Sequence, residues 1–358
     1  MVISQSKPTL SKKEIAATAD VIKAGKISEG IHTKEFESNL ANYVGCKYAT
    51  TVNSGTSALI STLLALEIGP CDEVVIPAYT CSSVYFAVKA VGAEPVLADI
   101  NLDTFSIEQS HINNLITSNT TAIILVHNFG IAAQMDKILD LEIPLIEDCA
   151  HVIGGSYNNK KLGSFGVASI FSFYATKMIT TGEGGAILTN SKKLINSVNE
   201  IKNADSSNTK NSKKFNFKFT DIQAAMGKVQ LEKIESFIRK RRRIATSYND
   251  AFQEIIGTGI PERDFYSDTF YRYVVKMPNK NKANAMIKST NISGITCDRP
   301  IQTAPFLFSK DSNKFKNSKI ANDCLVSIPI YPSLSEADVK KIINKCKIVM
   351  KKLSGDSS

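Results

Sequence analysis

Short apolar runs alternate with amphipathic stretches along the first two-thirds of the chain. The runs are rich in β-branched residues and are bounded by Gly, Pro, Asn or Asp, which is typical of buried strands. They lie at Tyr48–Val52, Val74–Pro77, Pro95–Asp99, Ala122–Val126, Pro144–Asp148, Ala168–Phe173 and Ala186–Thr189. Segments with apolar residues at helical spacing, such as Thr56–Leu66 and Ser82–Val91, lie between several of these runs. The pattern predicts an α/β fold with a mostly parallel sheet.

The last third of the chain contains two long helical patterns. Apolar residues at helical spacing predict one helix over 221–243 and another that covers 339–353. Ser333 and Glu336 offer a capping box at the start of the final helix. We therefore expect two domains in the 358 residues, a large one at 1–240 and a smaller C-terminal one at 241–358.

Composition and charge narrow the class of protein. Apolar residues make up 43% of the chain and charged residues 22%, which is ordinary globular usage. The net charge of +9 favours acidic partners without choosing between nucleic acid, a membrane and a phosphorylated small molecule. No spanning apolar segment and no secretory signal are visible, so we expect a cytoplasmic protein without a membrane partner. The cysteines show no CxxC spacing and the histidines no HExxH spacing, so we expect no metal site.

The first of three candidate segments, Asn53–Leu59, follows a predicted strand and opens a predicted helix. Free N–H groups at a helix N-terminus attract anions, and the hydroxyls of Thr56 and Ser57 could add hydrogen bonds. Small polar residues also serve as simple helix caps. The segment therefore indicates either a phosphate cradle or an ordinary cap.

The second segment is Ile146–His151. Asp148 ends a predicted strand, and ligands of parallel sheets bind beyond the carboxyl ends of the strands. Its carboxylate either pairs with a protonated ring nitrogen or caps the next helix. His151 either flanks a flat ligand or is a histidine with ordinary hydrogen bonds.

The third segment, Phe171–Gly185, has Ser172 near the end of a predicted strand, then Lys177 beyond it, and ends in a Gly-rich turn. A lysine beside a buried strand end is a candidate Schiff-base nucleophile, although most lysines are only solvated. Pyridoxal phosphate (PLP) needs a phosphate anchor, a carboxylate at its pyridine nitrogen and a lysine for its aldehyde. An anion cradle, Asp148 and Lys177 in this order on an α/β scaffold meet all three needs.

Several longer motifs occur in order along the chain. They include VNSGTSAL (Val52–Leu59), IEDCAH (Ile146–His151), GSFG (Gly163–Gly166), FSFYATKMITTGEGGAI (Phe171–Ile187) and FNFKFTDIQAAMG (Phe215–Gly227). From about Ile27 to Lys347 the sequence resembles the DegT/DnrJ/EryC1/StrS aminotransferases, PLP enzymes of nucleotide-sugar and aminosugar biosynthesis. The resemblance implies a type I PLP fold with a large domain, a smaller α+β C-terminal domain and an obligate homodimer with shared active sites.

The resemblance also assigns roles to residues at the cofactor. Lys177 matches the lysine that binds the cofactor as a Schiff base, and Asp148 matches the partner of the pyridine nitrogen. The positions that match phosphate-binding residues of the family are Gly55, Thr56 and Ser172.

Two further positions are assigned by the same resemblance. Asn216 matches the family asparagine that reaches the phosphate from the neighbouring subunit. His151 stands where the family often has Gln, close to the cofactor ring. The expected reaction moves an amino group from an amino acid, by analogy glutamate, to a keto-sugar that is nucleotide-linked in the typical case.

The sequence departs from the family pattern at four places. They are Cys81, Val167, Lys218 and Arg299–Pro305. These departures bear on the substrate pocket more than on the cofactor site, so they leave the acceptor sugar, the position aminated and the pathway open.

Three alternatives compete with the aminotransferase. Related PLP-dependent sugar dehydratases have His in place of the Schiff-base lysine, and Lys177 argues against that reaction. A basic DNA-binding regulatory protein could use the run Arg239–Arg243, but the sequence contains no zinc finger or separate DNA-binding module. An inactive scaffold is disfavoured by the presence of Lys177 and Asp148. We therefore expect small-molecule substrates and no nucleic-acid partner.

Overall fold

The computed structural model describes residues 2–205, 213–256 and 268–354. The α-helices are α1 (Lys12–Ala24), α2 (Ile31–Val44), α3 (Gly55–Ala65), α4 (Ser82–Val91), α5 (Gln109–Ile112), α6 (Asp136–Leu139), α7 (Lys192–Ile201), α8 (Asp221–Glu232), α9 (Ile234–Ile256), α10 (Lys280–Ile292), α11 (Lys316–Cys324) and α12 (Glu336–Ser354). The strands are β1 (Tyr48–Val52), β2 (Glu73–Pro77), β3 (Glu94–Ala98), β4 (Thr120–Val126), β5 (Leu145–Asp148), β6 (Ser156–Tyr157), β7 (Lys160–Lys161), β8 (Ala168–Ser172), β9 (Gly185–Thr189), β10 (Tyr273–Lys276) and β11 (Leu325–Ile328). None of the described helices is both long and apolar enough to cross a membrane.

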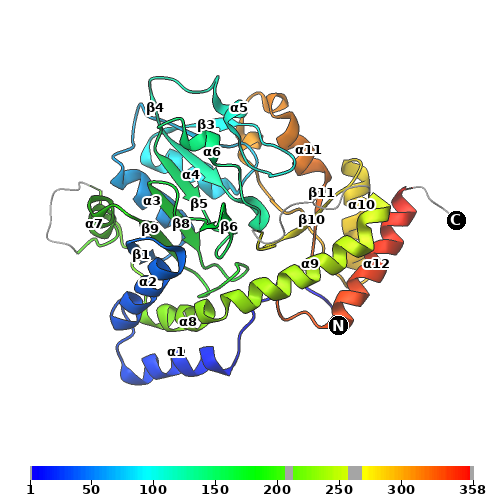
Figure 1. Cartoon of the computed structure of the whole chain (residues 1–358), viewed down its shortest axis with the longest axis horizontal. Coiled ribbons are helices and arrows are strands. Elements are labelled where there is room, and N and C mark those ends of the chain that lie inside the picture. Colours follow the sequence, from blue (N-terminus) through cyan, green and yellow to red (C-terminus); the bar gives the residue numbers. More distant parts are fainter. Residues whose placement is uncertain (1, 206–212, 257–267, 355–358) are drawn as a thin grey trace.

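A seven-stranded sheet forms the centre of the molecule, in the order β1-β9-β8-β5-β4-β2-β3 (Figure 1). Strands β3, β2, β4, β5 and β8 are parallel, whereas β9 runs antiparallel to both of its neighbours. Every predicted strand is present, with ends within two residues of the predicted ones. The predicted α/β fold with a mostly parallel sheet is therefore confirmed.

Helices cover both faces of this sheet. Successive side chains of a strand point to opposite faces, so Ile123 and Leu125 of β4 join one apolar cluster while Ile124 and Val126 join another. The cluster of Ile123 includes residues of α2, α8 and the start of α9, and that of Ile124 includes residues of α3, α4 and α7. The carboxyl ends of the parallel strands consequently meet at one edge between two helical layers.

A third apolar cluster forms a smaller α+β part beside the sheet. It joins residues of α9, α10, α12, β10 and β11, and it includes Ile3 from the other end of the chain. Helix α9 runs without a break from the sheet layers into this cluster (Figure 1). The predicted domain boundary between residues 240 and 241 falls inside α9, and the division into two domains stays a prediction.

Two local predictions in the C-terminal third were wrong. The helix predicted over 221–243 is two helices: α8 ends at Glu232 with Lys233 as its C-cap, and α9 then runs from Ile234 to Ile256. The final helix is capped by Ser335 and Asp338 instead of Ser333 and Glu336. Ser335 Oγ accepts from the Asp338 N–H at 3.1 Å, and the Asp338 carboxylate accepts from the Ser335 N–H at 3.2 Å.

Candidate active site

A cavity of about 300 Å³ lies at the carboxyl edge of the sheet, between the ends of β4, β5 and β8 and the start of α3. Ligands of parallel sheets bind at this edge, as the sequence analysis assumed. Six of the seven predicted site residues line this one cavity: Gly55, Thr56, Asp148, His151, Ser172 and Lys177. They come from three segments that are separated along the chain and that meet only in the fold.

The start of α3 forms one wall of the cavity, which is called the anion-binding wall here after its predicted role. Gly55 is the first residue of the helix, and Ser54 caps it by accepting from the Ser57 N–H at 3.0 Å. A Cβ at Gly55 would lie 3.1 Å from Ser172 Cβ, so a glycine lets the helix start approach the end of β8 closely. The N–H groups of Gly55 and Thr56 precede the first intrahelical hydrogen bond, at Ala58, so they are available to a phosphate.

Asp148 lies at the end of β5 and is 5% exposed. One carboxylate oxygen accepts from the Ala150 N–H at 3.0 Å, and no other hydrogen bond reaches this carboxylate within the described residues. Burial raises the pKa of Asp148, although the Ala150 N–H and the charges of Lys177 and His127 act in the opposite direction. A buried carboxylate with an unused oxygen fits a protonated ring nitrogen in the cavity.

His151 makes an ordinary hydrogen bond, and its place beside a flat ligand stays a prediction. Its Nδ1 accepts from the Phe129 N–H at 3.4 Å, and the residue also lines the cavity. Burial and the nearby charges of Lys177 and Arg272 lower the pKa of His151 well below 6.5, so the imidazole is neutral. A neutral ring can lie flat against a planar cofactor without adding charge to the site.

Lys177 lies in the loop between β8 and β9, and its side chain lines the same cavity as Asp148. The loop is closed by backbone hydrogen bonds from the Phe173 N–H to the Gly184 carbonyl and from the Thr181 N–H to the Phe173 carbonyl, at 2.8 and 3.0 Å. The lysine therefore comes from a loop that backbone hydrogen bonds hold in place, and it lines the same cavity as the carboxylate of β5. Together with the anion-binding wall, this arrangement fits the three attachment points of PLP.

Asn216 is the one predicted site residue that does not line this cavity. Its carbonyl accepts from Asn53 Nδ2 at 3.5 Å, beside the start of α3, and the residue is exposed. Asn216 thus lies next to the anion-binding wall, on the surface of the subunit and not in the cavity.

Some residues at the site were not predicted from the sequence. The lining includes Tyr174 and Glu183, and it also includes Cys81, which was singled out as a departure that bears on the substrate pocket. Tyr174 and Glu183 lie inside the predicted Lys177 segment and could have been found there. Tyr271 contacts Lys177 and His151 from outside the cavity, and no local motif pointed to it.

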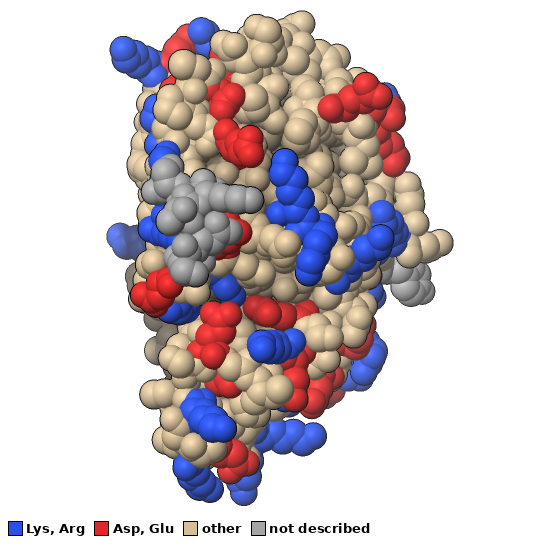
Figure 2. All heavy atoms as spheres, turned by 90° about the vertical axis from the view of Figure 1, so that its left-hand side faces the viewer, with Lys and Arg blue, Asp and Glu red and all other residues tan. Residues whose placement is uncertain are grey.

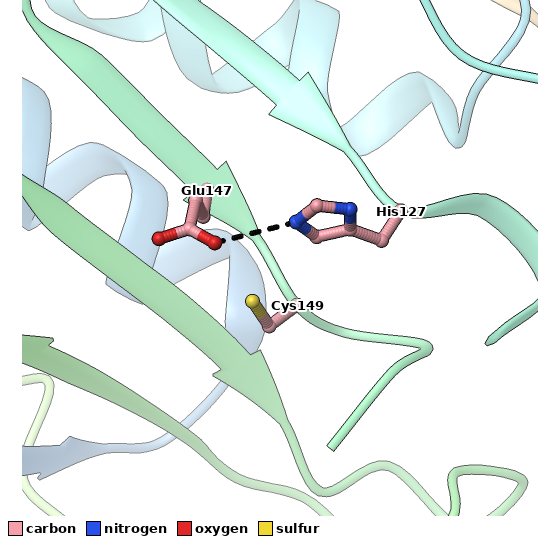
Figure 3. Close-up of side chains that lie close together, drawn as sticks. All are labelled: His127, Glu147 and Cys149. Atoms are coloured by element: carbon pink, nitrogen blue, oxygen red, sulfur yellow. Dashed lines mark hydrogen bonds and ion pairs between the residues drawn. The ribbon is translucent and has the colours of Figure 1, made fainter. Parts of the chain in front are cut away.

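A second cluster of potential ligands, made by His127, Glu147 and Cys149, lies beside the site (Figure 3). Their ligand atoms lie within 4.8 Å of one another. His127 Nδ1 accepts from the Ala133 N–H at 3.1 Å, so Nε2 carries the proton and faces Glu147 Oε2 at 3.4 Å. Burial and the Glu147 charge raise the pKa of the Cys149 thiol well above 9, which keeps it protonated. The cluster is thus a hydrogen-bonded network with a protonated thiol beside it.

The carboxylate of Glu147 holds the GSFG loop. It accepts from the N–H groups of Gly163, Phe165 and Gly166 at 2.8, 2.7 and 2.9 Å. Because Glu147 and Asp148 are consecutive on β5, they point to opposite faces of the sheet. One carboxylate therefore fixes the surrounding loop while the other lines the cavity.

Sequence comparisons identify the relatives of this chain. The profile of the DegT/DnrJ/EryC1/StrS aminotransferase family matches residues 8–347. The spore coat polysaccharide biosynthesis protein SpsC of Bacillus subtilis is 32% identical over 375 residues, covering 97% of this chain and 96% of SpsC. GDP-perosamine synthase of Escherichia coli O157:H7 is 32% identical over 349 residues, covering 93% of this chain and 94% of the synthase.

Solved structures show the same similarity in three dimensions. PseC of Helicobacter pylori, an aminotransferase of pseudoaminic acid biosynthesis, superposes with a TM-score of 0.90 at 25% identity, covering 98% of this chain and 100% of PseC. The PLP form of Spr1654 from Streptococcus pneumoniae superposes with a TM-score of 0.90 at 26% identity, covering 99% of this chain and 100% of Spr1654. The chain therefore belongs to the DegT/DnrJ/EryC1/StrS aminotransferase family and has the fold of its PLP-dependent sugar aminotransferases.

Proposed function

We propose that the protein transfers an amino group from an amino acid, with glutamate as the first candidate, to a nucleotide-linked keto-sugar, with PLP bound in the cavity of Asp148 and Lys177. The observation that carries the proposal is the convergence of an amine, a carboxylate and an anion-binding helix start on one cavity. Relatives named for GDP-perosamine and pseudoaminic acid synthesis support a sugar acceptor.

Each attachment point of the cofactor has a proposed partner in this chain. The N–H groups of Gly55 and Thr56 and the hydroxyl of Ser172 bind the phosphate. Asp148 accepts a hydrogen bond from the pyridine nitrogen and keeps it protonated. Lys177 Nζ binds the aldehyde, and the neutral His151 lies beside the ring plane. When bound, PLP supplies an electron sink for the negative charge that forms on the substrate carbon.

The chain itself moves the proton of the reaction. With the cofactor bound, Lys177 Nζ would hold its aldehyde, and the same amine, when free, would serve as the general base for the proton on the donor α-carbon. The same amine later returns a proton as a general acid. The negative charge of Asp148 stabilises the protonated ring nitrogen throughout, which is a preorganised electrostatic effect.

The proposed functional unit is a cytoplasmic homodimer with shared active sites. Asn216 is exposed beside the anion-binding wall of its own subunit and does not line that subunit's cavity. We assign its side chain to the phosphate of the neighbouring subunit. Each active site would then need residues from both chains.

The departures from the family pattern affect the site unequally. Cys81 lines the cavity, whereas Lys218 forms an ion pair with Asp205 at 2.5 Å. Arg299 donates to the carbonyls of Asp323 and Leu325 at 2.7 and 3.0 Å. Of these residues, Cys81 is the one placed to change which acceptor fits.

The DNA-binding alternative finds no support in the basic run Arg239–Arg243. Arg241 is 3% exposed and donates to backbone carbonyls, and Arg242 Nε donates to the Asp268 carbonyl at 2.9 Å. Acidic and basic side chains are intermixed on the face shown in Figure 2. The dehydratase and the inactive scaffold are disfavoured because Lys177 and Asp148 line one cavity.

Replacing Lys177 tests the proposed function directly. We expect Lys177→Ala to lose both the visible absorbance of lysine-bound PLP and all measurable turnover, because Lys177 has the only amine among the described residues that line the cavity. The matched control is Lys193→Ala, on the exposed side of α7. Donors and nucleotide keto-sugars are screened by the mass shift of the product. Full activity of Lys177→Ala would refute the assignment.

A further inference from the structure

One aromatic ring outside the cavity contacts both Lys177 and His151. The centroid of the Tyr271 ring lies 5.2 Å from Lys177 Nζ. The same ring stacks on the His151 imidazole, with centroids 4.3 Å apart and 19° between the planes. Tyr271 is 7% exposed, and it does not itself line the cavity. It therefore lies behind two proposed cofactor-binding side chains.

The hydroxyl of Tyr271 makes a further contact with the lysine loop. It lies 3.2 Å from Oγ1 of Thr176, the residue before Lys177. Burial raises the pKa of Tyr271, but the charges of Lys177 and Arg272 and the hydrogen bond with Thr176 lower it by more, to below its ordinary value of 10. The ring and the hydroxyl of one residue thus contact the lysine and its neighbour.

The backbone that carries Tyr271 is held in place by Arg241 of α9. Arg241 NH1 donates to the carbonyls of Phe270, Tyr271 and Ile330 at 3.1, 3.1 and 2.7 Å. Arg241 is 3% exposed, and carbonyls are its only hydrogen-bond partners in the described part of the chain. A buried guanidinium that bonds three carbonyls immobilises the segment before β10. The position of the Tyr271 ring is therefore fixed, whereas the Lys177 side chain has four rotatable bonds and can move relative to it.

We propose that Tyr271 is a positioning residue for Lys177: its ring restricts the position of the lysine amine at the edge of the cavity, and its stacking contact fixes the orientation of the His151 imidazole. A cation is attracted to the face of an aromatic ring, and this attraction is stronger where water is excluded. The amine leaves and rejoins the cofactor in every turnover, so a restricted amine reaches the reacting carbon more often. This inference rests on the proposed function, because it presumes that Lys177 binds the cofactor.

The experiment compares the holoenzyme with variants that separate the ring from the hydroxyl. Tyr271→Phe keeps the ring and removes the bond to Thr176, whereas Tyr271→Leu and Tyr271→Met remove the ring. The matched control is Tyr273→Leu, which removes another buried ring two residues away that contacts Tyr248 and Phe252. The readouts are the visible circular dichroism per bound cofactor, kcat and KM for the donor, the melting temperature, and the cofactor mass fixed on residue 177 by borohydride.

We expect the variants without the ring to lose visible circular dichroism and about tenfold in kcat, with little change in KM for the donor. Tyr271→Phe should retain most of both signals, and Tyr273→Leu should lose stability without losing the dichroism. Wild-type signals in Tyr271→Met or Tyr271→Leu would overturn the inference. Equal losses in Tyr271→Phe and Tyr271→Leu, or in Tyr273→Leu, would also overturn it.

The proposed function has its own readout in the same experiment. If borohydride fixes no cofactor mass on residue 177 of the wild-type protein, the proposed function fails and the role of Tyr271 fails with it. If wild-type residue 177 carries the cofactor and the ringless variants behave like wild type, only the role of Tyr271 is wrong.

Discussion

Single residues of β5 show how one strand serves two tasks. Asp148 lines the cavity, and the neighbouring Glu147 binds three N–H groups of the GSFG loop on the other side of the sheet. Adjacent strand positions face opposite ways, so two consecutive acids need not interfere with each other. A substitution at either position should therefore give a distinct result, one in catalysis and one in stability.

The stability contribution of Glu147 should depend on pH. Burial raises its pKa, but His127 and the N–H groups of Gly166 and Gly163 lower it by more, to below 4.5. A carboxylate with a lowered pKa stabilises the fold fully above its unfolded-state value and loses this contribution as the pH falls through the folded-state value. We expect Glu147→Gln to cost about 1–3 kcal/mol in the free energy of unfolding at pH 7, because an amide NH₂ would face backbone N–H groups.

Urea unfolding of the wild type and Glu147→Gln at pH values from 7 down to 3 measures this effect. The difference between the two proteins should stay constant down to about the unfolded carboxyl pKa near 4.3 and then shrink. A difference that is the same at every pH would contradict the assignment of a charged Glu147.

The residues of the site differ in how well sequence could find them. Asp148 and Ser172 lie at the ends of apolar runs and Lys177 follows one, and the strand-end rule brought all three to one cavity. Tyr271 could not be found in this way, since its partner Thr176 lies 95 residues earlier and the contact exists only after folding. The roles given to the site residues remain predictions until the variants are tested.

Among the elements, some helices are capped by carboxylates from distant parts of the chain. Asp99, just after β3, accepts from the N–H groups of Asn317 and Ser318 at 2.9 and 2.8 Å, at the start of α11. Asp221 of α8 accepts from the N–H groups of Gly30 and Thr33, at 2.8 and 2.9 Å, at the start of α2. Both carboxylates replace the local cap that these helices lack.

Removing one of these distant caps should weaken its helix specifically. We expect Asp99→Ala to cost about 1–2 kcal/mol in the free energy of unfolding, since the N–H groups of α11 lose their acceptor. Compared with the wild type, the variant should show faster amide hydrogen exchange in α11, and the increase should be larger there than in α12. The exposed Asp140→Ala is the control. Unchanged exchange in α11 would show that the cap adds no stability.

Local signals explain which elements the sequence predicted. The strands and α4 follow from continuous apolar runs and helical spacing, and their ends were predicted within two residues. The break at Lys233 was not predicted, because the apolar spacing continues across it and no Gly or Pro stands there. The wrong cap of α12 has a different reason: Ser333 and Ser335 each have an acid three residues later, and only packing selects between them.

At the scale of the whole molecule, α9 joins the sheet layers to the C-terminal part. Phe237 packs in the first cluster, whereas Ile244 and Tyr248 pack in the third. Arg241 lies between them on the same helix and fixes the segment of Tyr271. Through Arg241 and Tyr271, helix α9 therefore connects the C-terminal part to Lys177 by direct contacts.

The proposed shared active sites can be tested by mixing two inactive proteins. Lys177→Ala lacks the amine, and Asn216→Ala lacks the side chain assigned to the neighbouring phosphate. In a mixed dimer one site has both defects and the other has neither, so random reassortment should restore about a quarter of the wild-type activity. Mixing Lys177→Ala with a second Lys177 variant is the control. If the first mixture also stays inactive although mixed dimers form, Asn216 does not act across the dimer.

Ile3, near the start of the sequence, packs against residues of the C-terminal part. It is 5% exposed, forms a parallel bridge with Ile295, and packs in the same cluster as Met350 of α12, and Figure 1 shows the amino terminus beside that helix. The C-terminal part is consequently not a contiguous stretch of sequence. A fragment cut from residue 241 onward would lack this isoleucine and residues 234–240 of α9, so removing the leading residues would also weaken a core that lies at the other end of the chain.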